Sequence, residues 1–158
     1  MSMEHLITDR TSADVERWRT LHDKGWSAMN EAERAEWLAE MKGRYTYTDL
    51  NRVESAVAVV SERIRELGYE HPRLTVKTNW TRSDCPTKDD MDRYFGNVAA
   101  LRGAVAVLPG TPATPTTKGK LDYQMANDLE KILVNVDEVA TKIQRAWCYA
   151  GDIYFGEV

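Results

Sequence analysis

The sequence predicts an all-α protein whose main body is an antiparallel bundle of three long helices. Apolar residues recur at alternating spacings of three and four in three long stretches, and a residue suited to capping a helix precedes each stretch. These stretches place the helices at about 49–67, 88–108 and 122–150. Two short amino-terminal helices and a minor extended strap at about 74–80 complete the expected fold.

The length and charge of the chain narrow the class of protein. With 158 residues, the chain is expected to form a single helical domain over residues 1–158. Its formal net charge of −4, with both signs scattered along the chain, does not favour a nucleic acid as partner. No apolar run is long enough for a membrane span or for the core of a signal peptide, so we expect synthesis in the cytoplasm and no membrane insertion.

Capping boxes mark the two short amino-terminal helices. Residues 11–14 (Thr-Ser-Ala-Asp) open the first, and residues 30–33 (Asn-Glu-Ala-Glu) open the second. Glycine favours helix ends, so the first helix should close at Gly25 and the second at Gly43. Trp26 lies between the two helices and is expected to fill their junction as a core residue.

The first long helix is expected to begin after Thr48 and to stop at Gly68. Its mixed-charge face is interpreted as solvated and consists of Arg52, Glu54, Glu62, Arg63, Arg65 and Glu66. The apolar seam of this helix consists of Leu50, Val53, Val57, Val60, Ile64 and Leu67.

Between the first two long helices, apolar and polar residues alternate from Leu74 to Trp80. A period of two is typical of an extended strand, and a lone strand needs a partner. The amino-terminal lead and residues 153–155 are the candidates for that partner.

The second long helix should begin at a capping box formed by residues 87–90. Gly96 and Gly103 lower its helix propensity by about 1 kcal/mol each relative to alanine, which favours close packing of a neighbouring helix there. The seam of this helix consists of Met91, Tyr94, Val98, Leu101, Val105 and Leu108.

Residues 109–120 are rich in proline and threonine and are expected to form a stiff, exposed connector. Asp122 is suited to cap the helix that follows, and Gly151 to end it. At the usual rise per residue this helix would be roughly 40 Å long. Its seam consists of Met125, Leu129, Ile132, Val136, Val139, Ile143, Ala146 and Ala150.

The sequence contains no motif for a catalytic site, a cofactor or a metal, so none is assigned. Cys85 and Cys148 lack the paired spacing of metal ligands and are expected to be structural, at least half-buried thiols; one disulfide between them remains an alternative. Neither of the common phosphate-binding glycine motifs occurs. Trp80, Tyr45 and Tyr47 could form a platform for a sugar or peptide, but a role in the core is favoured.

The last residues of the chain are unusually aromatic. Residues 151–158 follow the last long helix as an aromatic tail, and such a tail is expected to dock on the body or on another chain. We therefore predict a partner interface at Tyr149, Ile153, Tyr154 and Phe155.

Six segments that cover most of the chain resemble a known group of proteins. The segments are ITDRTSADVERW, LHDKGWSAMNEAERAEWL, KGRYTYTDLNRVESAV, VKTNWTRSDCPT, LDYQMANDLEKIL and AWCYAGDIYFGEV. The group is a family from prophage and phage tail gene clusters of Gram-positive gut bacteria. Its members occur alone or as a module at the end of longer tail, baseplate or fibre proteins.

The resemblance implies a non-enzymatic virion structural or assembly protein located in the phage tail. Its expected partners are other tail or baseplate proteins or further copies of itself, with no cofactor. An alternative from another class is an accessory directed at the host cell wall, which would bind or hydrolyse glycans at the tail tip. Hydrolysis would require a cleft with convergent carboxylates.

Overall fold

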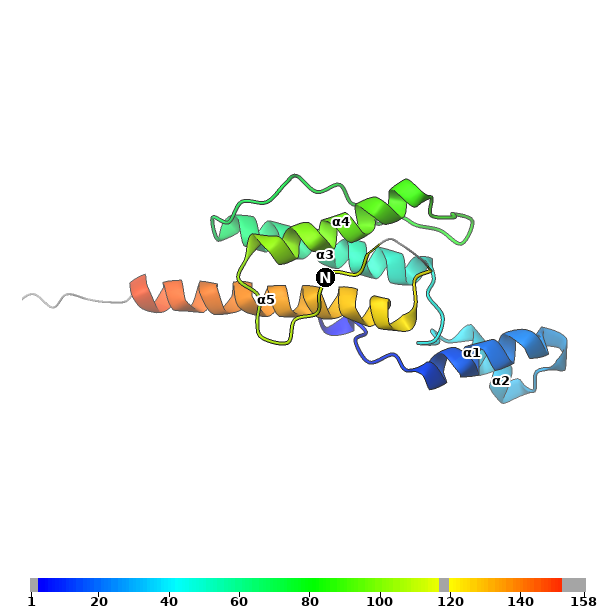
Figure 1. Ribbon diagram of the computed structural model, residues 1–158. Helices are drawn as coiled ribbons and strands as arrows, with labels where there is room; N and C mark the ends of the chain where they lie inside the picture. The colour runs from blue at the N-terminus through cyan, green and yellow to red at the C-terminus, as the bar shows by residue number, and fades with distance from the viewer. Residues whose placement is uncertain (1–2, 117–119, 152–158) are drawn as a thin grey trace, which may run out of the picture.

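The computed structural model describes residues 3–116 and 120–151, and every regular element in these ranges is a helix (Figure 1). The all-α fold class is therefore confirmed. The elements are η1 (Met3–His5), α1 (Ser12–Lys24), η2 (Trp26–Ala28), α2 (Glu31–Leu38), α3 (Tyr47–Glu66), α4 (Lys88–Ala104) and α5 (Tyr123–Gly151). Residues 152–158 of the predicted tail interface lie outside the described residues.

Most of the predicted helix starts are confirmed by their hydrogen bonds. The capping boxes at 11–14, 30–33 and 87–90 all form. Asp122 Oδ1 accepts a hydrogen bond from the amide of Met125 at 2.8 Å and so caps α5. The prediction was wrong for α3, because Thr46, with Asp49 three residues later, forms the box in place of Thr48.

The ends of two helices differ from the predictions. α2 ends at Leu38, and Gly43 lies in a later turn, where a Cβ atom would come within 2.0 Å of the Asp14 carbonyl oxygen. Gly43 therefore permits close approach of the backbone to α1 and does not end α2. α4 stops at Ala104, four residues before the predicted end at about Leu108.

The three long helices all pack against one another around a common core. Every predicted seam residue of α3 is buried, and the seam of α5 is buried from Leu129 to Val139. The central core side chains are Leu50, Val53, Val57, Val60 and Ile64 from α3, Tyr94, Phe95, Val98 and Leu101 from α4, and Leu129, Ile132, Leu133, Val136 and Val139 from α5.

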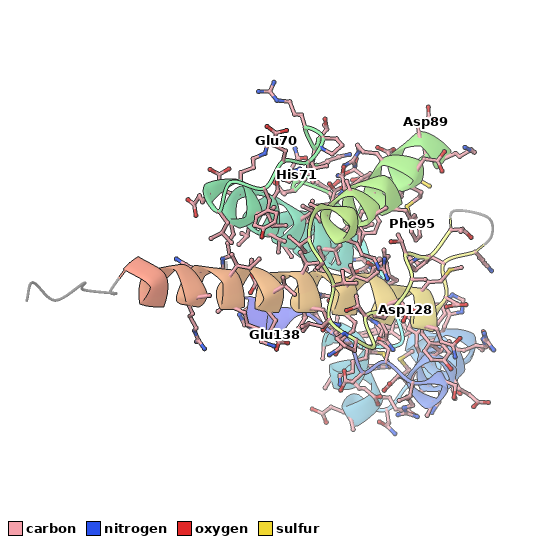
Figure 2. The ribbon with its side chains drawn as sticks, turned by 60° about the vertical axis from the view of Figure 1, so that its left-hand side comes forward. Glu70, His71, Asp89, Phe95, Asp128 and Glu138 are labelled. Carbon is pink, nitrogen blue, oxygen red and sulfur yellow. The ribbon has the colours of Figure 1, made fainter. Side chains whose placement is uncertain are left out.

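The predicted antiparallel arrangement of these helices is wrong, because all three run in the same direction (Figure 1). Arg52, near the start of α3, pairs with Glu130 in the first half of α5, whereas Arg63, near the end of α3, pairs with Asp137 further along α5. Figure 2 shows Asp89 and Asp128 toward one end of the bundle and Glu70 and Glu138 toward the other.

The lengths of the connections explain this parallel arrangement. Antiparallel neighbours need only a few residues between them, whereas residues 67–87 and 105–122 each supply roughly twenty. Each connection returns along the bundle to the end where the previous helix began. We call them the first and second return segments.

The first return segment contains the predicted extended strap, but without the predicted strand pairing. Leu74 and Val76 are half-buried against the core and Trp80 is buried, but the expected alternation fails between them, because Lys77 is half-buried and Thr78 is exposed. The strap binds helix side chains in place of a second strand. Asn51 of α3 accepts from the amide of Trp80 at 2.8 Å and donates to its carbonyl at 2.9 Å.

The second return segment is held to the bundle at two points, although several residues of the connector predicted at 109–120 are exposed, namely Pro109, Gly110, Ala113, Thr116 and Lys120. Arg102 Nε donates to the Pro112 carbonyl at 2.7 Å, and Asn135 Nδ2 of α5 donates to Thr111 Oγ1 at 2.9 Å. Thr111 and Pro112 are half-buried. These contacts fix the segment between α4 and α5.

Helices α1 and α2 form a small head at the end where α3 and α5 begin (Figure 1). Leu21 and Met29 are buried within the head, and no side chain of residues 12–38 joins the main core. Trp26 is 49% exposed beneath the guanidinium of Arg34, so its predicted role as junction core was wrong. Within the described residues, no helix is long and apolar enough to cross a membrane.

The two glycines of α4 do not mark a close helix contact as predicted. Gly96 and Gly103 are exposed, and a Cβ atom added at either would meet no heavy atom within 4 Å. Their backbones face solvent on the outer side of the bundle.

Replacing Gly96 with alanine is therefore expected to raise the free energy of unfolding by about 1 kcal/mol, because alanine favours helical backbone and the new methyl group meets only solvent. Urea unfolding measures this change. Gly43→Ala is the matched contrast and should lower stability, because its methyl group overlaps Asp14. A Gly96→Ala protein less stable than the parent would contradict this placement.

Candidate functional site

Four buried charged side chains meet between the amino-terminal lead, α3 and α5. Arg10 Nη2 donates to Glu130 Oε1 at 2.7 Å and to Asp49 Oδ1 at 3.1 Å. Arg52 Nη2 donates to the same two oxygens at 3.0 and 2.5 Å. None of these side chains is more than 9% exposed. We call the two cations and two anions the ion cluster.

The ion cluster also fixes the extended lead that precedes α1. Glu130 Oε2 accepts from the amide of Ile7 at 2.6 Å, and Arg10 Nη1 donates to the Ile7 carbonyl at 2.7 Å. Asn127 of α5 binds both backbone groups of Arg10, accepting at 3.0 Å and donating at 2.8 Å. The side-chain amide of Asn127 thus attaches the lead to α5 in the way that the side-chain amide of Asn51 attaches Trp80 to α3.

Every carboxylate oxygen of the ion cluster accepts a hydrogen bond. Glu130 Oε2 also accepts from Arg52 Nε at 3.1 Å, and Asp49 Oδ2 accepts from the amide of Thr46 at 2.7 Å. Burial by itself lowers the pKa of Arg52, but its bonds to Glu130 and Asp49 outweigh that effect and hold this pKa above its ordinary value. The cluster is therefore occupied internally and offers no free base for catalysis.

A second buried carboxylate holds the first return segment. Glu54 is bound at both oxygens by the guanidinium of Arg93 from α4, at 2.6 and 2.7 Å. It also accepts from the amide of Lys77 at 2.8 Å and from the indole of Trp80 at 3.3 Å. Its side chain is 1% exposed, so this group too has a structural position.

The prediction of a solvated polar face on α3 was wrong for Arg52 and Glu54, which are buried. It is confirmed for Glu62, Arg65 and Glu66, which are exposed.

The burial of Glu130 could have been predicted from the sequence. This residue lies four residues after Ala126 and three before Leu133, and both of these are buried. Glu130 thus falls on a second apolar stripe of α5, where an ionised side chain requires a buried partner.

Two tyrosine hydroxyl groups form another internal contact. The hydroxyls of Tyr45 and Tyr94 lie 2.5 Å apart where the starts of α3 and α4 meet. Burial raises the pKa of both phenols above the ordinary value, and for Tyr94 the neighbouring Tyr45 adds to the effect. Both groups are therefore neutral hydrogen-bonding residues over the physiological range.

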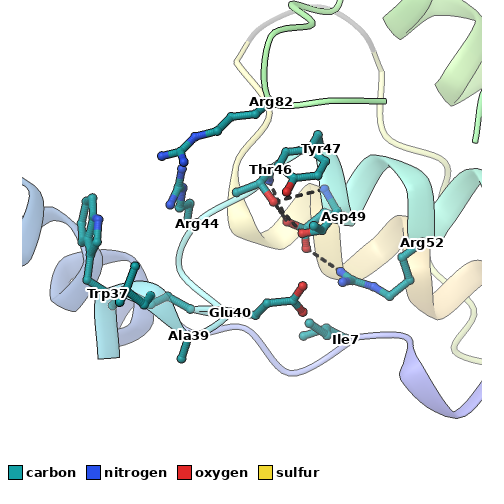
Figure 3. A pocket seen from close by; sticks show the side chains of 13 residues that line it. Ile7, Trp37, Ala39, Glu40, Arg44, Thr46, Tyr47, Asp49, Arg52 and Arg82 are labelled. Carbon is teal, nitrogen blue, oxygen red and sulfur yellow. Dashed lines mark hydrogen bonds and ion pairs between the residues drawn. The ribbon is translucent and has the colours of Figure 1, made fainter. Parts of the chain in front are cut away.

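A hollow of about 270 Å³ lies between the head and the start of α3, and we call it the head hollow (Figure 3). Leu38, which is 75% exposed, and Tyr47, which is 39% exposed, contribute to its lining. Arg44 and Arg82 come from different segments, and their guanidinium groups point toward one another in Figure 3. Arg44 also lies over the ring of Trp37, 5.7 Å from its centre.

A second hollow of about 500 Å³ adjoins the first, and we call it the aromatic hollow. Thr46 and Tyr47 line both hollows, so the two hollows are neighbours. The other lining residues of the aromatic hollow are Tyr45, Leu50, Asp84, Pro86, Met91, Phe95, Lys120 and Leu121.

The cysteines and histidines considered as nucleophiles or metal ligands do not come together in the described structure. Cys85 is a free, exposed thiol and not the half-buried one expected, while the side chain of Cys148 lies outside the described residues. His22 lies near Trp18 and Trp37 in the head, and His71 contacts Ser61 at the far end of α3. Among the described residues, no group of three or more His, Cys, Asp or Glu side chains could hold a metal ion.

The aromatic residues considered for a ligand platform or a partner interface lie in different environments. Trp80 is buried, as the favoured core interpretation predicted, whereas Tyr47 is exposed at the hollows. Tyr149 of the predicted partner interface belongs to α5, and its side chain is outside the described set. Ile153, Tyr154 and Phe155 lie beyond the described part of the chain.

Comparison with known proteins identifies no relative: the chain matches no protein-family model, no curated protein and no solved structure.

The raised pKa values of Tyr45 and Tyr94 predict a fall in stability at alkaline pH. Unfolded tyrosine ionises near pH 10, whereas these two phenols keep their protons in the folded state. The free energy of unfolding should therefore decrease as pH rises above about 10. The double variant Tyr45→Phe/Tyr94→Phe should lose part of this dependence, as measured by urea unfolding at several pH values. Tyr69→Phe, at an exposed position, is the control, and an equal loss in it would contradict the assignment.

Proposed function

We propose that this protein is a non-enzymatic structural or assembly module of a phage tail that acts by contacting other proteins. The single observation that carries the proposal is the separation of two kinds of side chain. The charges with potential for chemistry are paired inside the protein, while bulky apolar side chains are exposed beside arginines at the head hollow. Exposed apolar residues gathered with arginine are typical of protein interfaces.

The assignment to a phage tail rests on the six segments that resemble the tail protein family. The all-α fold is compatible with such a module, since a bundle with rigid, capped helices presents surfaces of fixed shape. Fold alone does not define function, so the tail location is tested by experiment.

The chemistry of the head hollow favours a contact role over glycan hydrolysis. Most glycoside hydrolases use two carboxyl groups that flank the bond being cleaved. Asp49 is committed to Thr46 and to two arginines, which leaves Glu40 as the other carboxylate lining this hollow. A glycan platform would also lack Trp80, because that ring is buried.

Location in the particle is the direct test of this proposal. An antibody against the chain should label the tails of purified particles in immunogold electron microscopy, and mass spectrometry should find the chain at a fixed number of copies per particle. Particles that lack the chain, or purified protein that hydrolyses cell-wall material, would contradict the proposal.

The contact surface can be tested with exposed substitutions. Tyr47→Asp and Leu38→Asp should weaken binding to the contacting tail protein at least tenfold, or about 1.4 kcal/mol, because each places a charge in an apolar contact. Tyr69→Asp is the matched control, since Tyr69 is similarly exposed but lies beyond the far end of α3. Equal effects of the three substitutions would place the contact elsewhere.

A further inference from the structure

Among the residues that line the two neighbouring hollows, positive charges without an ion pair outnumber negative ones. Arg44 and Arg82 line the head hollow, and Lys120 lines the aromatic hollow. None of the three has an ion pair with a carboxylate among the described residues.

Of the carboxylates that line the hollows, Asp49 is paired with Arg10 and Arg52, and Asp84 is paired with Lys77. This leaves Glu40 to balance three cations, so a partner with negative groups is favoured there.

The same two hollows expose apolar groups between these charges. Leu38 and Tyr47 are the most exposed of them, and Met91 and Pro86 are half-buried around the aromatic hollow. A complementary ligand would therefore carry bulky apolar side chains with acidic groups beside them. An extended peptide with an acidic residue at each end of an aromatic core has this chemistry.

We infer that the occupant is the carboxyl-terminal segment of a second copy of this chain. Residues 152–157 read Asp-Ile-Tyr-Phe-Gly-Glu, with Asp152 and Glu157 on either side of Ile153, Tyr154 and Phe155. The acids match the arginines and the aromatic residues match the apolar lining. This inference rests on the proposed contact function and names the partner of the contact surface.

The segment must come from another molecule, because residues 152–157 follow directly after Gly151 and cannot reach back to the hollow. Asp49 and Arg52 line the head hollow and bind Glu130, so the hollow lies beside the first half of α5. From Glu130 to Gly151 the helix rises roughly 30 Å away from the hollow. Residues 152–158 extend at most roughly 25 Å.

This geometry makes the contact head-to-tail. The hollows lie at the end where α3, α4 and α5 begin, and α5 projects beyond the other helices at the opposite end (Figure 1). Each copy would thus accept one neighbour and insert into another. Such a heterologous contact produces a ring when its rotation closes and an open row of copies when it does not.

Charge reversal with sedimentation velocity tests the inference on the full chain. The parent protein should assemble as its concentration rises from about 5 to about 200 μM, and added salt should weaken the assembly. Arg44→Glu/Arg82→Glu and Asp152→Lys/Glu157→Lys should each remain monomeric. An equimolar mixture of these two variants should assemble again, because each reversed hollow then meets a reversed tail.

A matched variant controls for net charge. Arg65→Glu/Arg73→Glu changes two exposed arginines outside both hollows and should assemble like the parent. Arg82→Glu alone serves if the double substitution disturbs the head, since Arg82 is exposed and Arg44 stacks on Trp37.

Three results would overturn the inference: a monomeric parent at every concentration, assembly that survives both reversals, or folded variants whose mixture stays monomeric. A monomeric chain that still labels particle tails would leave the proposed function intact, so the two failures are distinguishable.

Discussion

The ion cluster is the interaction on which the arrangement of the molecule depends. Arg10 comes from the lead, Asp49 and Arg52 from α3, and Glu130 from α5, so one set of bonds joins three distant parts of the chain. Arg10 Nε has no hydrogen-bond partner, but every carboxylate oxygen of the cluster is bound. Because a buried charge without an oppositely charged partner is costly, the cluster penalises any other register of these segments. The cluster therefore fixes the start of α3 beside the first half of α5. It also fixes the lead that carries the head.

A parallel bundle creates a second physical requirement, which helix side chains satisfy. The first return segment crosses the bundle as extended chain, and its backbone groups need partners because no strand occurs in the described part of the protein. Asn51 binds both backbone groups of Trp80 in the first return segment, and Asn127 does the same for Arg10 in the extended lead. Buried Glu54 and Asn97 bind further points of the first return segment. The starts of all three helices thus gather at one end, where they form the two hollows beside the head.

The sequence predicted local structure well and long-range structure poorly, for identifiable reasons. Capping boxes and apolar seams depend on neighbouring residues, so the start of α4 and the buried face of α3 were predicted correctly. Helix direction depends on where a connection ends, and the length of residues 67–87 was the overlooked signal. The burial of Arg10 and Arg52 depends on Glu130, far away in sequence, and no local pattern reveals that pairing. The head hollow likewise combines Leu38, Tyr47 and Arg82, which share no motif.

A double-mutant cycle between Arg10 and Glu130 tests the central role of the ion cluster most directly. Arg10→Met and Glu130→Gln should each cost about 3–5 kcal/mol in urea unfolding, because each leaves an unbalanced charge buried. The double variant keeps one cation and one anion, Arg52 and Asp49, at 2.5 Å, so it should lose less than the sum of the single losses. We expect a coupling energy of at least about 1.5 kcal/mol. Single losses below about 0.5 kcal/mol, or strict additivity, would contradict the account.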